Sequence, residues 1–243
     1  MPNYRLTLSY DGTNRPGWQR LAPNDRSIQG RLEAALTELF GQPVEVNGSG
    51  RTDAGVHAAG QVASFTAPER DPEELLRRLR HLLPADIGAL TLEQAPPRFH
   101  ARLSAVGKTY VYRIWNSPVP DVFARRFRVC VPQRLDEEAM RRAAADLVGT
   151  HDFTSFCVRG KKSAVRTLTE LSVRREGDAL TLTFSADGFL HHMVRILTGT
   201  LLEVGLGKRP AESMPALLAE KRRAAAGQTA PAAGLCLMEV RYP

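Results

Sequence analysis

The spacing of apolar and polar residues over the first 98 positions predicts the order strand, helix, strand, strand, helix, strand. Residues 4–10 alternate in the way typical of a strand that is buried on one side. Residues 27–40 carry apolar side chains at helical spacing, and Ser27 is placed to cap that helix. Asp71 and Pro72 begin a second helix, because a capping carboxylate followed by proline is a strong helix start. The remaining elements are the helix body at 73–83 and strands at 43–48, 61–67 and 87–95.

The second half of the chain predicts a similar order of elements. A strand is expected at residues 107–116 and a helix opened by Asp136 after it. A turn at 176–178 joins two strands, and residues 189–205 form an apolar helical stripe. Further segments are a last strand at 235–243, a helix near 210–225, and insertions at 117–126 and 149–165. This order predicts an α+β protein whose mainly antiparallel sheets form two ferredoxin-like halves, 1–98 and 99–243, joined across a central cleft.

Composition adds a clue about the partner. The chain of 243 residues has 33 Lys and Arg against 26 Asp and Glu, a net charge of +7. Such a surplus favours a polyanionic partner, because neutralised phosphates release counterions, although it is also compatible with a charge that only keeps the protein soluble. The basic residues gather in four clusters, which favours RNA or DNA as the partner. These clusters are Arg77, Arg78 and Arg80; Arg125, Arg126 and Arg128; Arg159, Lys161, Lys162 and Arg166; and Lys221, Arg222 and Arg223.

Localisation and redox chemistry follow from what the sequence does not contain. The chain starts on a strand pattern and not on a signal peptide, and no apolar run approaches the ~18 residues of a membrane span. Cys130, Cys157 and Cys236 are far apart and form no C-x-x-C, which argues against a disulfide framework or a zinc knuckle. We therefore expect a soluble cytoplasmic protein.

The stretch NGSGRTDAGVHAAG, residues 47–60, is the strongest candidate for a site. Its glycines lack the spacing of a dinucleotide loop, and no Lys-Ser/Thr follows as in a Walker loop, so a nucleotide cofactor is disfavoured. Gly50 and Gly55 allow a planar group to approach the backbone. Asp53, with Arg51 nearby to keep it ionised, is then either a nucleophile or a residue that braces a turn. The residues alone leave this choice open.

Two further positions could take part in chemistry. Tyr110 and Tyr112 point the same way from one strand, and either core packing or stacking on an exposed base would suit such a pair. Arg195 lies opposite the apolar stripe of its predicted helix, beside Gly199, and is either solvated or aimed at a carboxylate of the other half. His191 and His192 are expected to diverge around the same helix, so no zinc site is expected.

Several motifs in order resemble one known family. GRTDAGVHA at 50–58, YDGT with GWQ at 10–19, FHARLSAVGKTYVYRI at 99–114 and FLHHMVRILTGTLLEVG at 189–205 are similar to the tRNA pseudouridine synthase A family. Further matches are SIQGRLE at 27–33, LLPADI at 82–87, GTHDFTSF at 149–156 and TAPAAGLCL at 229–237. The resemblance spans nearly the whole chain. It implies an isomerase that converts uridine to pseudouridine at positions 38–40 of the tRNA anticodon stem-loop.

The same resemblance implies roles for single residues. Asp53 matches the catalytic aspartate, Tyr110 the tyrosine that stacks on the target base, and Arg195 the basic residue that pairs with the aspartate. Arg51 matches the arginine that helps to hold the flipped nucleotide. The family is homodimeric and uses neither a metal nor another cofactor, so tRNA and a second copy of the chain are the expected partners.

Two departures from the family pattern bear on tRNA contacts. Relatives usually have an aromatic residue where this chain has Asn14-Arg15-Pro16, and an Asn is common where it has Arg80. Ser49, often Ala in relatives, is a smaller change. The competing functions are a non-catalytic RNA-binding or RNA-chaperone protein on the same scaffold, and a hydrolase that uses an Asp nucleophile on a small substrate.

Overall fold

The computed structural model describes residues 1–22, 26–158 and 163–243 and divides into two units. The first unit holds Met1–Val106 together with Leu237–Pro243, and the second holds Gly107–Cys236. The chain therefore leaves the first unit once and returns to it with its last residues. Both units combine helices with mainly antiparallel strands, so the predicted α+β class is confirmed.

The sheet of the first unit is centred on β1 (Asn3–Tyr10). This strand pairs antiparallel with β3 (His57–Thr66) on one side and with β4 (Ile87–Ala95) on the other. The final strand β10 (Leu235–Arg241) lies beside β3, and Gly60 of β3 lets the carbonyl of Met238 come close. The alternating face of β1 is buried as its sequence predicts, with Tyr4, Leu6 and Leu8 fully enclosed.

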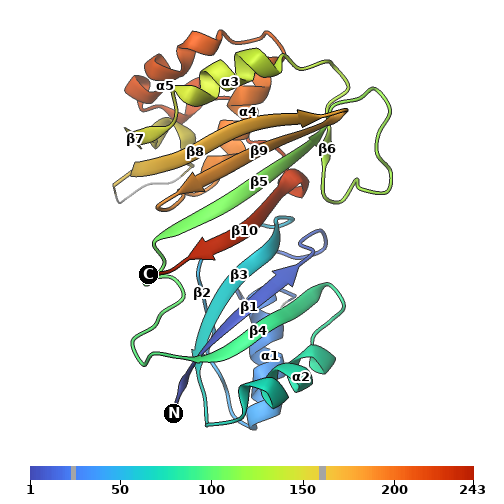
Figure 1. Cartoon of the computed structure of the whole chain (residues 1–243), viewed down its shortest axis with the longest axis vertical. Coiled ribbons are helices and arrows are strands. Elements are labelled where there is room, and N and C mark those ends of the chain that lie inside the picture. Colours follow the sequence, from blue (N-terminus) through green and yellow to red (C-terminus); the bar gives the residue numbers. More distant parts are fainter. Residues whose placement is uncertain (23–25, 159–162) are drawn as a thin grey trace. The chain divides into compact units, whose positions relative to one another are not determined.

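Two helices cover one face of this sheet, α1 (Ile28–Phe40) and α2 (Pro72–Leu82), as Figure 1 shows. Their buried residues include apolar side chains at helical spacing, Ile28, Leu32 and Leu36 in α1 and Leu75 and Leu79 in α2. Ser27 caps α1 by accepting from the amide of Gly30 at 3.1 Å, and Asp71 caps α2 by accepting from Glu74 at 3.0 Å. Both predicted caps are confirmed.

The strand expected at 43–48 is mostly absent. Only Asn47–Gly48, named β2, pairs with β3. The backbone before it is bonded by side chains of α1 instead: Val46 donates its amide to Glu33 and accepts at its carbonyl from Gln29. These contacts from a helix replace strand pairing, and no periodicity within 43–48 signals them.

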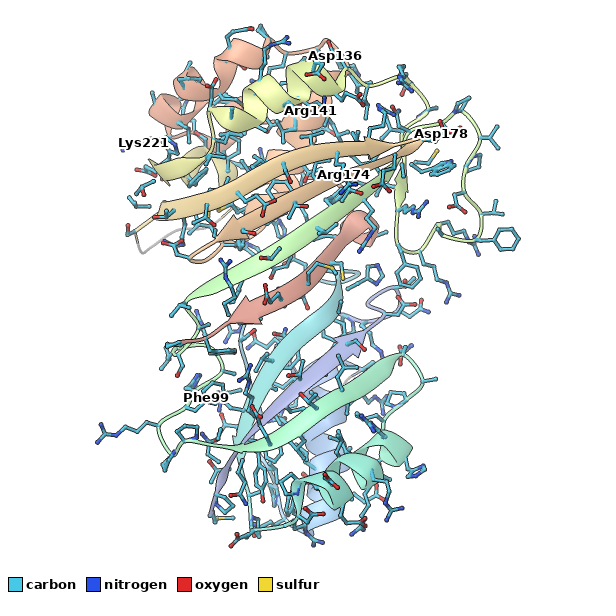
Figure 2. All side chains as sticks on the ribbon, in the orientation of Figure 1. Phe99, Asp136, Arg141, Arg174, Asp178 and Lys221 are labelled. Carbon is cyan, nitrogen blue, oxygen red and sulfur yellow. The ribbon has the colours of Figure 1, made fainter. Side chains whose placement is uncertain are left out.

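The second unit orders its main strands β5, β9, β8, β7. Their bounds are β5 Gly107–Trp115, β9 Ala179–Ala186, β8 Val165–Glu176 and β7 Gly149–Asp152, all antiparallel, with a short β6 (Val129–Cys130) parallel to the end of β5. Figure 1 shows α3 (Glu137–Ala145), α4 (Met193–Gly205) and α5 (Met214–Glu220) gathered on one side of these strands. Arg141 of α3, labelled in Figure 2, donates to the carbonyl of Val173 in β8 and ties this helix to the sheet.

Helix bounds in the second unit differ from prediction in two places. The helix predicted at 189–205 begins only at Met193, because His192 has φ 62°, a left-handed conformation that a helix cannot contain. The helix predicted near 210–225 is broken into short turns, Ala211–Ser213 and Arg223–Ala225, around α5. α5 ends at Glu220, because the next residue, Lys221, is again left-handed with φ 50°. Within the described residues, no helix has the length and apolar character needed to span a bilayer.

Candidate active site

The glycine-rich stretch forms a fixed turn between β2 and β3. The amide of Val56 donates to the carbonyl of Asp53 at 3.2 Å, and Gly55 in the third position of this turn has φ 79°. Positive φ at that position favours glycine, so the sequence DAGV specifies the turn locally. This hydrogen bond uses the main-chain carbonyl of Asp53. It therefore does not support the interpretation that the Asp53 carboxylate braces the turn.

A second segment, residues 10–18, holds this turn from outside. The amide of Trp18 donates to Thr52 at 3.0 Å, and the amide of Gly55 donates to Arg15 at 3.3 Å. The hydroxyls of Tyr10 and Thr52 are 2.8 Å apart and both groups are buried. The YDGT and GWQ motifs are therefore the structural partners of GRTDAGVH within the first unit.

Glycines make the contact between the two segments possible. A β-carbon at Gly12 would lie 2.1 Å from the carbonyl oxygen of Val56, and one at Gly17 would lie 2.8 Å from that of Thr52. Backbone atoms cannot move aside as a flexible side chain can, so any larger residue would push the segments apart. Gly48 serves the same purpose for Trp18, whose ring would lie 2.3 Å from an added β-carbon.

The first unit thus presents Arg51 and Asp53 on one clamped turn. Arg51 is exposed, and no hydrogen bond or ion pair of its side chain is found among the described residues. A long cation at the surface, two positions from the carboxylate, has the reach that a role in holding a displaced nucleotide would need.

The structure assigns Tyr112 to core packing, while stacking of Tyr110 on a base stays a prediction. Tyr112 is fully buried and donates to the carbonyl of Pro231 at 2.8 Å, so it belongs to the core of the second unit. Tyr110 keeps part of its ring exposed and meets Phe189 edge to face, with ring centres 5.1 Å apart. Phe189 was not singled out from the sequence, and it orients the ring of Tyr110.

Arg195 is held by the chain and not merely solvated. Its Nε donates to the carbonyl of Ala230 at 2.8 Å, while the amide of Ala230 donates back to the carbonyl of Arg195 at 3.0 Å. Burial raises the pKa of Tyr112 well above its ordinary value, and the charge of Arg195 opposes that shift, which places the guanidinium near this tyrosine. The solvated interpretation of Arg195 is therefore wrong.

Gly199 lets the backbone of another segment pack closely against α4. A β-carbon there would lie 1.7 Å from the carbonyl oxygen of Gln228, so the segment that leads to Ala230 packs directly on α4. The prediction that His191 and His192 diverge is also wrong: they precede the helix, and their rings lie 4.0 Å apart at 34°. That no zinc binds stays a prediction.

Comparison with known proteins gives one family for nearly the whole chain. The profile described as tRNA pseudouridine synthase matches residues 7–103 and 143–243. A Moorella thermoacetica protein named tRNA pseudouridine synthase A is 47% identical over 246 residues. A Bacillus cereus protein named tRNA pseudouridine synthase A 2 is 43% identical over 245 residues, and both alignments cover all of this chain and all of the relative.

This chain belongs to the tRNA pseudouridine synthase family. The predicted resemblance and the predicted enzyme class, an isomerase, are confirmed by this membership. Of the four residues singled out for chemistry, the structure places Arg51 and Asp53 together in the first unit, and Tyr110 and Arg195 in the second. That the two pairs share one site stays a prediction.

The structure gives the family departures structural partners. Arg15, within the Asn14-Arg15-Pro16 stretch that departs from the expected family pattern, is buried and forms a two-bond ion pair with Asp86 of LLPADI. Arg80 donates to the carbonyls of Ala89 and Leu90, each at 2.8 Å, along the edge strand β4. Neither interaction could be predicted from either residue alone, because each partner lies in another element.

The basic clusters of this family member are partly neutralised within the fold. Lys221, labelled in Figure 2, lies 2.8 Å from Asp152 and, together with hydrogen bonds from Thr154, lowers the pKa of that carboxyl to about 2. Arg128 likewise pairs with Asp121 at 3.2 Å, whereas Arg125 is exposed. Three residues of another cluster, Arg159, Lys161 and Lys162, lie outside the described residues. A basic track for RNA stays a prediction.

Substitution of Gly199 tests how Arg195 is held. Gly199→Ala drives a methyl group into the carbonyl of Gln228 and should lower the free energy of unfolding by ~1–3 kcal/mol, the usual cost of overpacking. Gly205→Ala is the matched control on α4, because the atoms nearest to its added methyl belong to the side chains of Met140 and Leu135 and not to backbone. Urea unfolding measures the free energy of unfolding of both variants. Equal losses for the two variants would contradict this packing.

Proposed function

We propose that this protein isomerises uridine to pseudouridine at positions 38–40 of the tRNA anticodon stem-loop. The observation that carries the proposal is the family match, which includes residues of both units and is accompanied by relatives that align end to end. The clamped turn that carries Asp53 supports it, since a nucleophile must be held in one place to attack efficiently.

The reaction conserves atoms and needs no cofactor. The bond between N1 of uracil and C1′ of ribose breaks, the base rotates, and C5 forms a new bond to C1′. C5 loses a proton to solvent and N1 gains one. The protein must therefore supply a nucleophile or base, a cation to keep it ionised, and a surface that holds the base while it turns.

Asp53 is the proposed nucleophile. Its carboxylate attacks C1′ of ribose or C6 of uracil, or else acts as the base of a route through a glycal, and all three routes use the ionised form. Arg195 is the proposed partner that keeps it ionised and oriented. The bond from Arg195 Nε to Ala230 supports this role, because it fixes the position of the guanidinium on its segment.

Arg51 and Tyr110 are the proposed substrate-binding residues. The enzyme must turn the uridine out of its stack at a cost of a few kcal/mol, and Arg51 is exposed and long enough to enter the space that the base leaves. Tyr110 stacks on the uracil and helps to remove the C5 proton. Its ring is already fixed by Phe189, which lowers the entropy that stacking must overcome.

The protein acts as a cytoplasmic homodimer in this proposal. Family resemblance supports the dimer, in which the basic surface of one protomer holds the body of the tRNA while the site of the other takes the anticodon arm. The net charge of +7 supports a nucleic-acid partner in either state.

Loss of the Asp53 carboxylate should abolish the reaction. Tritium release from tRNA that carries 5-³H-uridine measures loss of the C5 proton directly, and Asp53→Asn keeps the size of the side chain while removing its charge. We expect release to fall to the background of the assay for Asp53→Asn, with robust release by the wild type. Robust release by the variant would rule out the nucleophile, and no release by the wild type would favour the RNA-binding alternative.

Loss of the Arg195 charge should separate chemistry from binding. Arg195→Met keeps the length of the side chain but cannot hold the carboxylate, so kcat should fall by about 100-fold or more while the Kd for tRNA stays near the wild-type value. Filter binding and single-turnover tritium release measure the two quantities. An unchanged kcat, or a loss confined to tRNA affinity, would contradict the pairing with Asp53.

A further inference from the structure

We propose that the ion pair between Arg15 and Asp86 positions the turn that carries Asp53, which makes Arg15 a positioning residue for the isomerisation. This inference rests on the proposed function for its kinetic consequence, while the structural link itself lies wholly within the first unit. Arg15 would act on the rate through the backbone of the turn and not through contact with tRNA.

The pair is built as an anchor. Arg15 is only 8% exposed, and its Nε donates to Asp86 at 2.8 Å beside a second bond from Nη2 to the same carboxylate. Its remaining terminal nitrogen donates to the carbonyl of Arg26 at 3.0 Å. Three bonds in fixed directions determine both the position and the orientation of the guanidinium. These bonds also hold the pKa of Asp86 below its ordinary value, although burial opposes that shift.

The backbone of Arg15 passes this anchoring on to the active-site turn. Its carbonyl accepts from Gly55, and its amide donates to Gly12 at 2.9 Å. Gly12 in turn lies against the carbonyl of Val56. Arg15 therefore contacts the turn directly and also fixes the segment that packs against its far end.

Asp86 secures the same segment from its other end. Its carbonyl accepts from the amide of Asp11 at 3.0 Å, while its carboxylate holds the side chain of Arg15. The intervening residues Thr13 and Asn14 are exposed, as is Pro16, so Arg15 supplies the buried side chain of this stretch. Without that side chain, the segment between Gly12 and Gly17 would keep its backbone bonds but lose its side-chain attachment to Asp86 and Arg26.

A small displacement of the Asp53 carboxylate is enough to slow the reaction. A nucleophile that is displaced by about 1 Å can lose about 100-fold in rate, even when substrate binding is unchanged. Since Asp53 begins the turn whose third residue, Gly55, donates to Arg15, movement of the Arg15 carbonyl moves the carboxylate relative to its target. The ion pair should therefore influence kcat more than tRNA affinity.

Arg15→Met tests this with Arg5→Met as its matched control. Both variants remove an arginine of the same unit that pairs with a carboxylate, but Arg5 lies on β1 and pairs with Glu93 of β4 at 3.4 Å. We expect single-turnover tritium release by Arg15→Met to fall by roughly 10- to 100-fold relative to Arg5→Met, with Kd values for tRNA within about twofold of each other. Arg15→Lys should fall between Arg15→Met and the wild type, because lysine keeps the charge but cannot form the paired bonds.

Hydrogen exchange of residues 50–57 gives a readout that does not depend on catalysis. The amides of this turn should exchange faster in Arg15→Met and in Asp86→Asn, and remain as in the wild type in Arg5→Met. Equal rates of tritium release by Arg15→Met and Arg5→Met would overturn the inference, as would unchanged exchange of the turn. If Arg15→Met does not fold, Arg15→Lys and Asp86→Asn decide the matter by the same two measurements. A wild type without tritium release would instead count against the proposed function, and the exchange result would still stand.

Discussion

The close approach of two backbone segments is the constraint on which the first unit depends. Gly12 and Gly17 let residues 10–18 lie directly on the turn at 52–56, at separations that leave no room for a β-carbon. Such contact aligns main-chain groups, so the bonds between Trp18 and Thr52 and between Arg15 and Gly55 join the two segments directly. The glycines of the signature motifs therefore have a mainly structural role: they let the two segments pack closely and so fix the turn that carries Asp53.

In the second unit, a glycine of a helix allows a similarly close approach of two backbone segments. Gly199 allows the segment after Gln228 to pack on α4, and the carbonyl of Ala230 then holds Arg195 by its Nε. In both units a residue of the proposed chemistry is thus attached to a short irregular segment that lies against glycine. Irregular backbone can be rigid when it is bonded on both sides, and this suits residues that must neither move nor be enclosed by regular structure.

Local sequence patterns were sufficient to predict elements whose contacts lie close by in the sequence. The alternation in β1 and the caps Ser27 and Asp71 follow from spacing alone, and the structure confirms them. The sequence failed where partners come from elsewhere in the chain. Residues 43–46 look like a strand but are bonded by α1, and the start of α4 depends on the left-handed backbone of His192, which no helical periodicity reveals.

The candidate site shows the same division. Its residues were identified by resemblance, because chemistry alone could not distinguish a nucleophilic Asp53 from one that braces a turn. The sequence did not reveal the hydrogen-bond partners that hold Arg195 and the active-site turn. Ala230 lies 35 positions after Arg195, and Asp86 lies 71 positions after Arg15. Such long-range partners depend on the fold and become visible only with it.

The most direct measurement is a map of pseudouridine in a tRNA transcript that has been incubated with the purified protein. Unmodified transcripts with uridine at positions 38, 39 and 40 provide the substrate, and reverse transcription after chemical labelling of pseudouridine reports each position. The account predicts new pseudouridine in the anticodon stem-loop at one or more of these positions and none in the rest of the molecule. A transcript that stays unmodified, or that is modified only outside the anticodon stem-loop, would contradict it.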